Sequence, residues 1–123
     1  MKSILLVEDD PFIVDIYSRQ LKKEGFALDS AKDGKMALEK LKNHHPDLLI
    51  LDLILPDMSG WDILRQVRAH ADLKNLKVMV ISNLNQKEQQ ENIDTLGVLR
   101  YLLKIETAPD EMSRAVKEIL GQL

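Results

Sequence analysis

The chain has 123 residues, 45% of them hydrophobic and 30% charged, which suits one compact domain with a buried core. Its net charge of −3 gives no general attraction to nucleic acid, because contacts to a phosphate backbone need clustered Lys and Arg. The absence of cysteine excludes disulfides and thiolate chemistry, and no apolar run approaches the roughly 20 residues that span a bilayer. We therefore expect one cytoplasmic domain over residues 1–123 that binds neither nucleic acid nor a membrane.

The first third of the chain alternates short apolar segments with helix signals. Residues 4–7 are continuously apolar, as in a strand that is buried on both faces of a parallel sheet. Asp10 followed by Pro11 is a typical helix start. In residues 26–30, Phe26, Leu28 and Ser30 alternate with Ala27 and Asp29, which suits a strand at the edge of a sheet with one wetter face. Asp33 precedes the next helix pattern.

The rest of the chain continues this alternation. Residues 48–51 and 78–81 are two more continuously apolar segments, and Ser59 precedes a helix pattern between them. Residues 99–103 are mixed, which predicts the strand at the other edge, and residues 109–120 carry one apolar helical stripe. Together these elements predict an α/β fold of the (βα)₅ kind, a doubly wound parallel sheet with helices on both faces.

The fourth predicted helix, residues 86–96, differs from the others because it is very polar. Asn85 with Glu88 three residues later resembles a capping box at its start. Only Ile93 and Leu96 are candidates for burial. Few buried contacts mean low local stability, so we expect this helix to be the mobile element of the fold.

Polar side chains follow four of the predicted strands at the point where each strand ends. These are Glu8 and Asp9, Asp52, Ser82, and Lys104. In an open parallel sheet, ligands bind beyond the carboxyl ends of the strands, so we expect these side chains to share one rim. Carboxylates without thiolate or imidazole favour a hard cation such as Mg²⁺. The residues themselves therefore predict a divalent-metal site that is suited to an anionic group on a carboxylate.

Five segments also carry a resemblance to a known family, namely 4–10, 47–53, 55–60, 80–83, and Gly97 with 101–104. In this order, and over essentially the whole chain, they resemble the receiver domain of two-component response regulators, of the stand-alone type. The resemblance implies the flavodoxin-like strand order 2-1-3-4-5. That order places the second and fifth strands at the edges, as the patterning does.

The resemblance assigns chemistry to single residues. It implies that Asp52 accepts a phosphoryl group as an acyl phosphate, from a histidine kinase or a histidine phosphotransfer protein. It implies that Glu8, Asp9 and Asp52 hold Mg²⁺ together with the backbone carbonyl of Ile54. Lys104 is then the cation that pairs with the phosphoryl group.

The same resemblance implies a switch. Ser82 bonds a phosphoryl oxygen and draws its loop inward, and Tyr101 moves from an exposed to a buried position. The surface of the fourth helix, fifth strand and fifth helix then changes and signals to an unknown downstream protein. Dimerisation of the phosphorylated chain through this surface is a further expectation.

Four residues depart from the family pattern. Ile105 replaces the usual Pro after the lysine, so we predict a trans bond between Lys104 and Ile105, since a cis bond there would cost about 2.5–4 kcal/mol. Asn83 is larger than the usual Ala or Gly, so it either crowds the site or offers a hydrogen bond. Ile54 and Leu84 are apolar at positions that tune hydrolysis of the acyl phosphate, which predicts slow autodephosphorylation. We expect no enzymatic activity beyond these reactions of the protein on itself.

Other functions and roles remain as alternatives. The first is a phosphorylation-independent pseudo-receiver that acts as a protein-interaction module. An FMN carrier is disfavoured because the acidic loop that holds Glu8 and Asp9 would repel the cofactor's phosphate, and a phosphatase is disfavoured because there is no cap to recognise a substrate. Asp10 is interpreted as a helix cap, and Asp57 as a structural turn residue.

Overall fold

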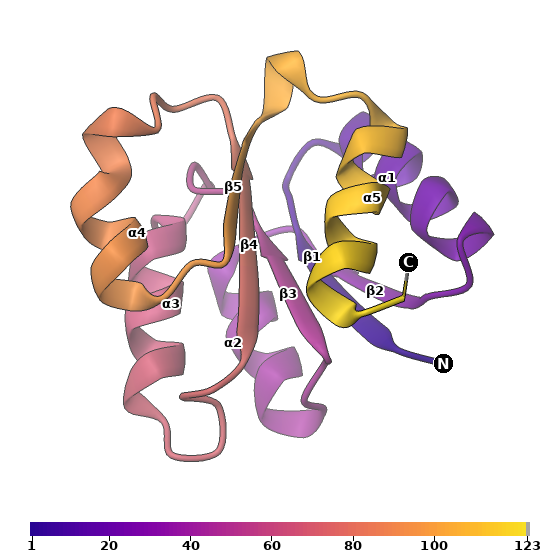
Figure 1. Cartoon of the computed structure of the whole chain (residues 1–123). Coiled ribbons are helices and arrows are strands. Elements are labelled where there is room, and N and C mark those ends of the chain that lie inside the picture. Colours follow the sequence, from indigo (N-terminus) through magenta and orange to yellow (C-terminus); the bar gives the residue numbers. More distant parts are fainter. Residues whose placement is uncertain (123) are drawn as a thin grey trace.

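The computed structural model describes residues 1–122, which form a five-stranded parallel sheet between two layers of α-helices (Figure 1). The strands are β1 (Ser3–Val7), β2 (Ala27–Ala31), β3 (Leu48–Leu51), β4 (Lys77–Ser82) and β5 (Arg100–Leu103). The helices are α1 (Pro11–Lys23), α2 (Gly34–Asn43), α3 (Gly60–Ala69), α4 (Gln90–Leu96) and α5 (Pro109–Leu120). The strand order is β2-β1-β3-β4-β5, so the predicted fold and both predicted edge strands are confirmed.

The central strands are apolar throughout because both faces of the sheet are covered. In β1, Ile4 and Leu6 pack on the side of α1 and α5. Leu5 and Val7 pack on the opposite side, with α2, α3 and α4. Figure 1 shows these two helix layers on either side of the sheet. Strands β3 and β4 alternate in the same way, so each central strand contributes to two cores.

Side chains at the predicted positions cap three of the helices. The Asp10 carboxylate accepts from the Phe12 N–H at 2.9 Å, and the Asp33 carboxylate accepts from the Met36 N–H at 2.8 Å. The Ser59 hydroxyl accepts from the Asp62 N–H at 3.2 Å. Each bond satisfies a donor that the first turn of a helix leaves without a partner.

Among residues 1–122, every helix is too short or too polar to span a bilayer.

The fourth helix begins differently from the prediction. Residues Lys87–Gln89 form a 3₁₀ turn, and α4 follows from Gln90. The Asn85 side chain accepts from the N–H groups of Lys87 and Glu88 at 2.9 and 3.3 Å, so it caps the tight turn and not α4 itself. Ile93 is buried, as predicted.

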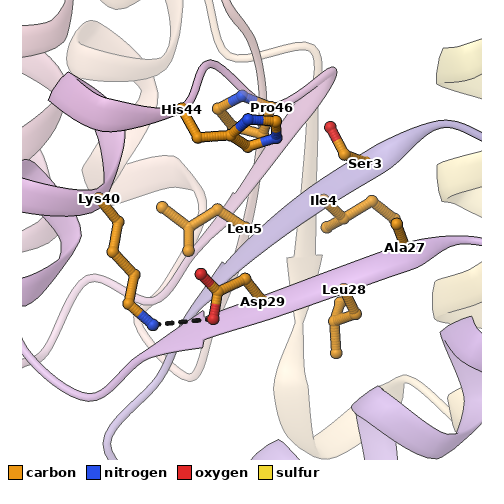
Figure 2. A pocket seen from close by; sticks show the side chains of 9 residues that line it. All are labelled: Ser3, Ile4, Leu5, Ala27, Leu28, Asp29, Lys40, His44 and Pro46. Atoms are coloured by element: carbon orange, nitrogen blue, oxygen red, sulfur yellow. Dashed lines mark hydrogen bonds and ion pairs between the residues drawn. The ribbon is translucent and has the colours of Figure 1, made fainter.

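A small cavity of about 150 Å³ lies beside the starts of β1 and β2 (Figure 2). Its wall is mostly apolar and includes Ile4 and Leu28. At its edge the Lys40 ammonium pairs with the Asp29 carboxylate at 2.8 Å. None of the residues lining this cavity follows the carboxyl end of a strand, where the predicted site residues are found.

Candidate functional site

The carboxyl ends of the strands bring the predicted site residues to one rim of the sheet, at the top in Figure 1. Glu8 and Asp9 follow β1, and Asp52 follows β3. One carboxylate oxygen from each of these three residues lies within 4.8 Å of the other two. Glu8 and Asp52 are buried, with 2% and 5% of their surface exposed, whereas Asp9 is exposed. The predicted acidic cluster is therefore present.

The sheet itself fixes the two buried acids. The Glu8 N–H donates to the carbonyl of Ala31 at 3.0 Å, and the Asp52 N–H donates to the carbonyl of Val7 at 3.0 Å. Each bond extends the parallel pairing one residue beyond the strand. Both carboxylates therefore leave a backbone whose direction the neighbouring strand sets.

Lys104 lies between these carboxylates. Its Nζ is 2.6 Å from Oε1 of Glu8 and 2.9 Å from Oδ2 of Asp52. The second oxygen of each acid accepts from backbone N–H groups, at 3.0 Å from Asp9 to Glu8 and at 2.7 Å from Leu53 to Asp52. Every carboxylate oxygen of the buried pair thus has a hydrogen-bond donor.

Burial and charge act in opposite directions on this group. The pKa of Glu8 is raised to about 7, chiefly because the carboxyl group is buried; the hydrogen bond from Lys104 opposes this rise, and the nearby charge of Asp52 adds to it. Burial alone would lower the pKa of Lys104, but its hydrogen bonds to Glu8 and Asp52 outweigh burial, so its pKa is raised. Lys104 therefore remains a cation between two acids.

The donor set fits a hard divalent cation. Three carboxylates from two neighbouring strand ends supply oxygen ligands, which Mg²⁺ prefers. The fit has a consequence for Lys104, because a cation on Glu8 would compete with the ammonium group for the same carboxylate. The backbone carbonyl of Ile54, the fourth predicted ligand, stays a prediction.

Ser82 and Tyr101 meet at the loop that follows β4. The fully buried Ser82 hydroxyl accepts from the Leu84 N–H at 3.2 Å. The Tyr101 hydroxyl donates to the Leu84 carbonyl at 2.7 Å, and its ring packs in the core that contains Ile93. Only 8% of Tyr101 is exposed, so the structure has it in the buried position that we predicted as the end of its movement. Its movement from an exposed position stays a prediction.

The two departures after Ser82 and Lys104 contact each other. The Asn83 Oδ1 accepts from the Ile105 N–H at 2.9 Å, so of the two effects expected of Asn83 the hydrogen bond is the one observed. No peptide bond within residues 1–122 is cis, which confirms the predicted trans bond before Ile105. Sequence reasoning did not pair these residues, since they are 22 positions apart.

Sequence analysis also missed two constraints on the segment after Asp52. A Cβ on Gly60 would lie 2.4 Å from the carbonyl oxygen of Asp52, so only glycine lets α3 start against this strand end. The Asp57 carboxylate accepts from the N–H groups of Gly34 and Lys35 at 2.8 and 2.9 Å, which links this segment to α2 and gives Asp57 the predicted structural role. Neither contact has a local sequence signal.

Comparison with known proteins gives one consistent result. The family model described as response regulator receiver domain matches residues 4–117. The polar-differentiation response regulator DivK of Brucella ovis is 26% identical over 120 residues, which are 98% of this chain and 97% of DivK.

Solved structures of such proteins have the same fold. A CheY-like receiver domain protein of Methanospirillum hungatei is 28% identical, with a TM-score of 0.88 over 99% of this chain and 96% of its own. The response regulator TrrA of Thermotoga maritima, solved in complex with Mg²⁺ and BeF, is also 28% identical. Its TM-score is 0.83, over 97% of this chain and 99% of TrrA.

Proposed function

The chain belongs to the family of response regulator receiver domains, and from this premise we propose that Asp52 accepts a phosphoryl group in two-component signalling. The observation that carries the proposal is the buried Asp52 carboxylate, which shares the Lys104 ammonium with Glu8 beside the exposed Asp9. An isolated pair of buried acids would be costly, and a charged rim of this kind suits the binding of an ion.

We propose Mg²⁺ as the cation. Glu8, Asp9 and Asp52 would hold it with the carbonyl of Ile54, and when bound it supplies positive charge beside the oxygens of the incoming phosphoryl group. The complex of TrrA with Mg²⁺ and BeF supports this choice.

Phosphoryl transfer depends mainly on positioning the reacting groups and on neutralising the charge of the phosphoryl oxygens. An Asp52 oxygen attacks phosphorus, while the bond from phosphorus to a histidine nitrogen of the donor protein breaks and its electron pair stays on the imidazole. Lys104 already lies 2.9 Å from Asp52 and moves its hydrogen bonds to the new phosphoryl oxygens. Ser82 donates its hydroxyl to another of these oxygens. Apart from this transfer and a slow hydrolysis of the acyl phosphate, no enzymatic activity is proposed.

The output would be a change of shape of this receiver domain, in the cytoplasm. Once Ser82 turns toward the phosphoryl group, its bond with the Leu84 N–H is lost, and the loop that holds Tyr101 through the Leu84 carbonyl must rearrange. The surface of α4, β5 and α5 then differs between the two forms. A downstream protein, or a second copy of the chain, would bind one form of this surface better than the other.

Phosphorylation by a small-molecule donor tests the proposal without knowledge of the kinase. The protein is incubated with acetyl phosphate and Mg²⁺, and its intact mass is measured with and without a chelator. We expect one added phosphoryl group that depends on the metal, and no addition to Asp52→Asn. An unchanged wild-type mass under conditions that modify another receiver protein would instead favour the phosphorylation-independent interaction module.

A further inference from the structure

The loop after β4 is attached to β5 and the turn that follows β5 by consecutive contacts. Ser82 is the register partner of Leu103 at the end of the β4–β5 pairing. One residue later, the Asn83 side chain accepts from the Ile105 N–H at 2.9 Å. These contacts bracket a single residue of the neighbouring chain segment, which is Lys104.

Lys104 begins a 3₁₀ turn (Lys104–Glu106) directly after β5. The first N–H groups of such a turn have no partner within the turn, and they are satisfied by a side chain from elsewhere or by water. Asn83 does this for the N–H that follows the carbonyl of Lys104. The backbone of Lys104 is therefore held by pairing of Leu103 on one side and by Asn83 on the other.

The side chain of Lys104 is also held at its end, by two hydrogen bonds. Its Nζ bonds to two acids that come from different strands, at 2.6 Å to Glu8 and 2.9 Å to Asp52. A flexible four-carbon side chain reaches two such partners reliably only if its backbone is fixed. Asn83 is exposed, and its side-chain hydrogen bond goes to the Ile105 N–H and not to Glu8 or Asp52. Any influence of Asn83 on Asp52 therefore passes through Lys104.

We propose that Asn83 is a positioning residue for Lys104, acting through the N–H of Ile105. This bond needs both an acceptor at position 83 and a residue other than proline at position 105, since proline has no N–H. The inference rests on the proposed function, because Lys104 is positioned for phosphoryl transfer to Asp52.

The experiment is a double-mutant cycle on the rate of phosphorylation. Asn83→Ala, Ile105→Pro and the double variant are incubated with Mg²⁺ and acetyl phosphate over a range of concentrations, and the rate of mass addition is measured. Loss of one neutral hydrogen bond predicts a maximal rate about fivefold lower for Asn83→Ala. In the Ile105→Pro background the same substitution should have no further effect, because the bond is already absent.

Asn85→Ala is the matched control. Asn85 lies on the same loop and caps the 3₁₀ turn Lys87–Gln89, with no contact to Ile105 among its hydrogen bonds. We expect its maximal rate to stay within about twofold of the wild-type rate, since it removes a local cap and not the bond that fixes Lys104. If Asn83→Ala matches Asn85→Ala, or lowers the rate equally in both backgrounds, the positioning role is wrong.

Amide hydrogen exchange provides a second measurement that needs no phosphorylation and no proline variant. The Ile105 N–H should be protected in the wild-type protein and exchange faster in Asn83→Ala, with the Leu103 N–H unchanged. Equal exchange of Ile105 in both proteins would overturn the inference. A wild-type protein that takes no phosphoryl group, but shows the expected exchange, would overturn the proposed function and leave the Asn83–Ile105 bond established.

Discussion

At the scale of single residues, Lys104 compensates the negative charge of the two buried carboxylates in the site. Its side chain is only 15% exposed, and its ammonium group bridges the carboxylates of Glu8 and Asp52. Removing one partner of a buried ion pair leaves the other charge uncompensated, which is usually more costly than the pair was favourable.

Lys104→Met should therefore be destabilised by about 3 kcal/mol in the absence of divalent ions. Mg²⁺ should raise its melting temperature more than it raises that of the wild-type protein, because the cation no longer competes with the ammonium group. Thermal unfolding of both proteins with and without Mg²⁺ measures this. Equal shifts would show that Lys104 and the metal do not share the carboxylates.

Gly60 makes a second prediction at this scale, with Gly34 as its control. A Cβ at position 60 would lie 2.4 Å from the backbone carbonyl oxygen of Asp52, whereas a Cβ at position 34 would meet the side chain of Met58 at the same distance. A methionine side chain moves aside easily and a strand does not. We expect Gly60→Ala to cost roughly 1–3 kcal/mol in urea unfolding and Gly34→Ala clearly less. A reversed order would contradict the packing described for α3.

At the scale of elements, side chains of α3 form a row of hydrogen bonds with the segment that contains α4. Three residues at helical spacing on α3 reach three positions along the segment that contains α4. The pairs are Trp61 with Gln89 at 2.8 Å, Arg65 with Asn92 at 3.4 Å, and Arg68 with the carbonyls of Leu96 and Gly97 at 2.8 and 3.3 Å. These bonds add to the burial of Ile93 in holding α4 against α3, and the mobility expected of this helix stays a prediction.

Arg68 makes the most hydrogen bonds of the three, since its guanidinium group also donates to the carbonyls of Lys74 and Leu76 before β4. Arg68→Lys keeps the charge but loses the planar set of donors, and we expect a loss of about 1–3 kcal/mol. Hydrogen exchange should accelerate at the Val98 N–H, which bonds the Ile93 carbonyl at the end of α4. Arg65→Lys, at a largely exposed position, should change this exchange little.

Asp57 supports the start of α2 in a way that depends on pH. Hydrogen bonds from the backbone N–H groups of Gly34 and Lys35 lower the pKa of Asp57 below its model-compound value of 3.8. Its stabilising effect is therefore complete above about pH 4 and is lost as the pH falls through the lowered value in the folded protein. Asp57→Ala should melt below wild type at pH 7, and the difference should shrink as the pH falls below the ordinary pKa of an aspartate. A difference that is constant with pH would assign the loss to packing.

At the scale of the whole molecule, the sequence contained most of the fold. Continuous apolar runs such as 48–51 marked the central strands because both faces of the sheet are buried. Asp10, Asp33 and Ser59 marked helix starts because capping is local. The acidic rim was predictable for a similar reason, since parallel strands end at a common edge.

The remaining features depend on contacts between distant residues. The bond between Asn83 and Ile105 and the reach of Arg68 to four carbonyls join segments whose separation is known only after folding. The bond from the buried Tyr101 to the carbonyl of Leu84 likewise joins residues 17 positions apart. The 3₁₀ turn before α4 was missed because Asn85 can cap a tight turn as well as an α-helix.

We propose that Glu8, Asp9 and Asp52, from two strand ends, share one cation while Asp52 receives a tri-oxygen anion. A crystal structure with Mg²⁺ and beryllofluoride tests it most directly. We expect the beryllium group on Asp52, Mg²⁺ on Glu8, Asp9 and Asp52, and the Lys104 ammonium bonded to a fluoride in place of Glu8. A beryllofluoride group elsewhere, or carboxylates that turn apart while Lys104 keeps its bond to Glu8, would contradict it.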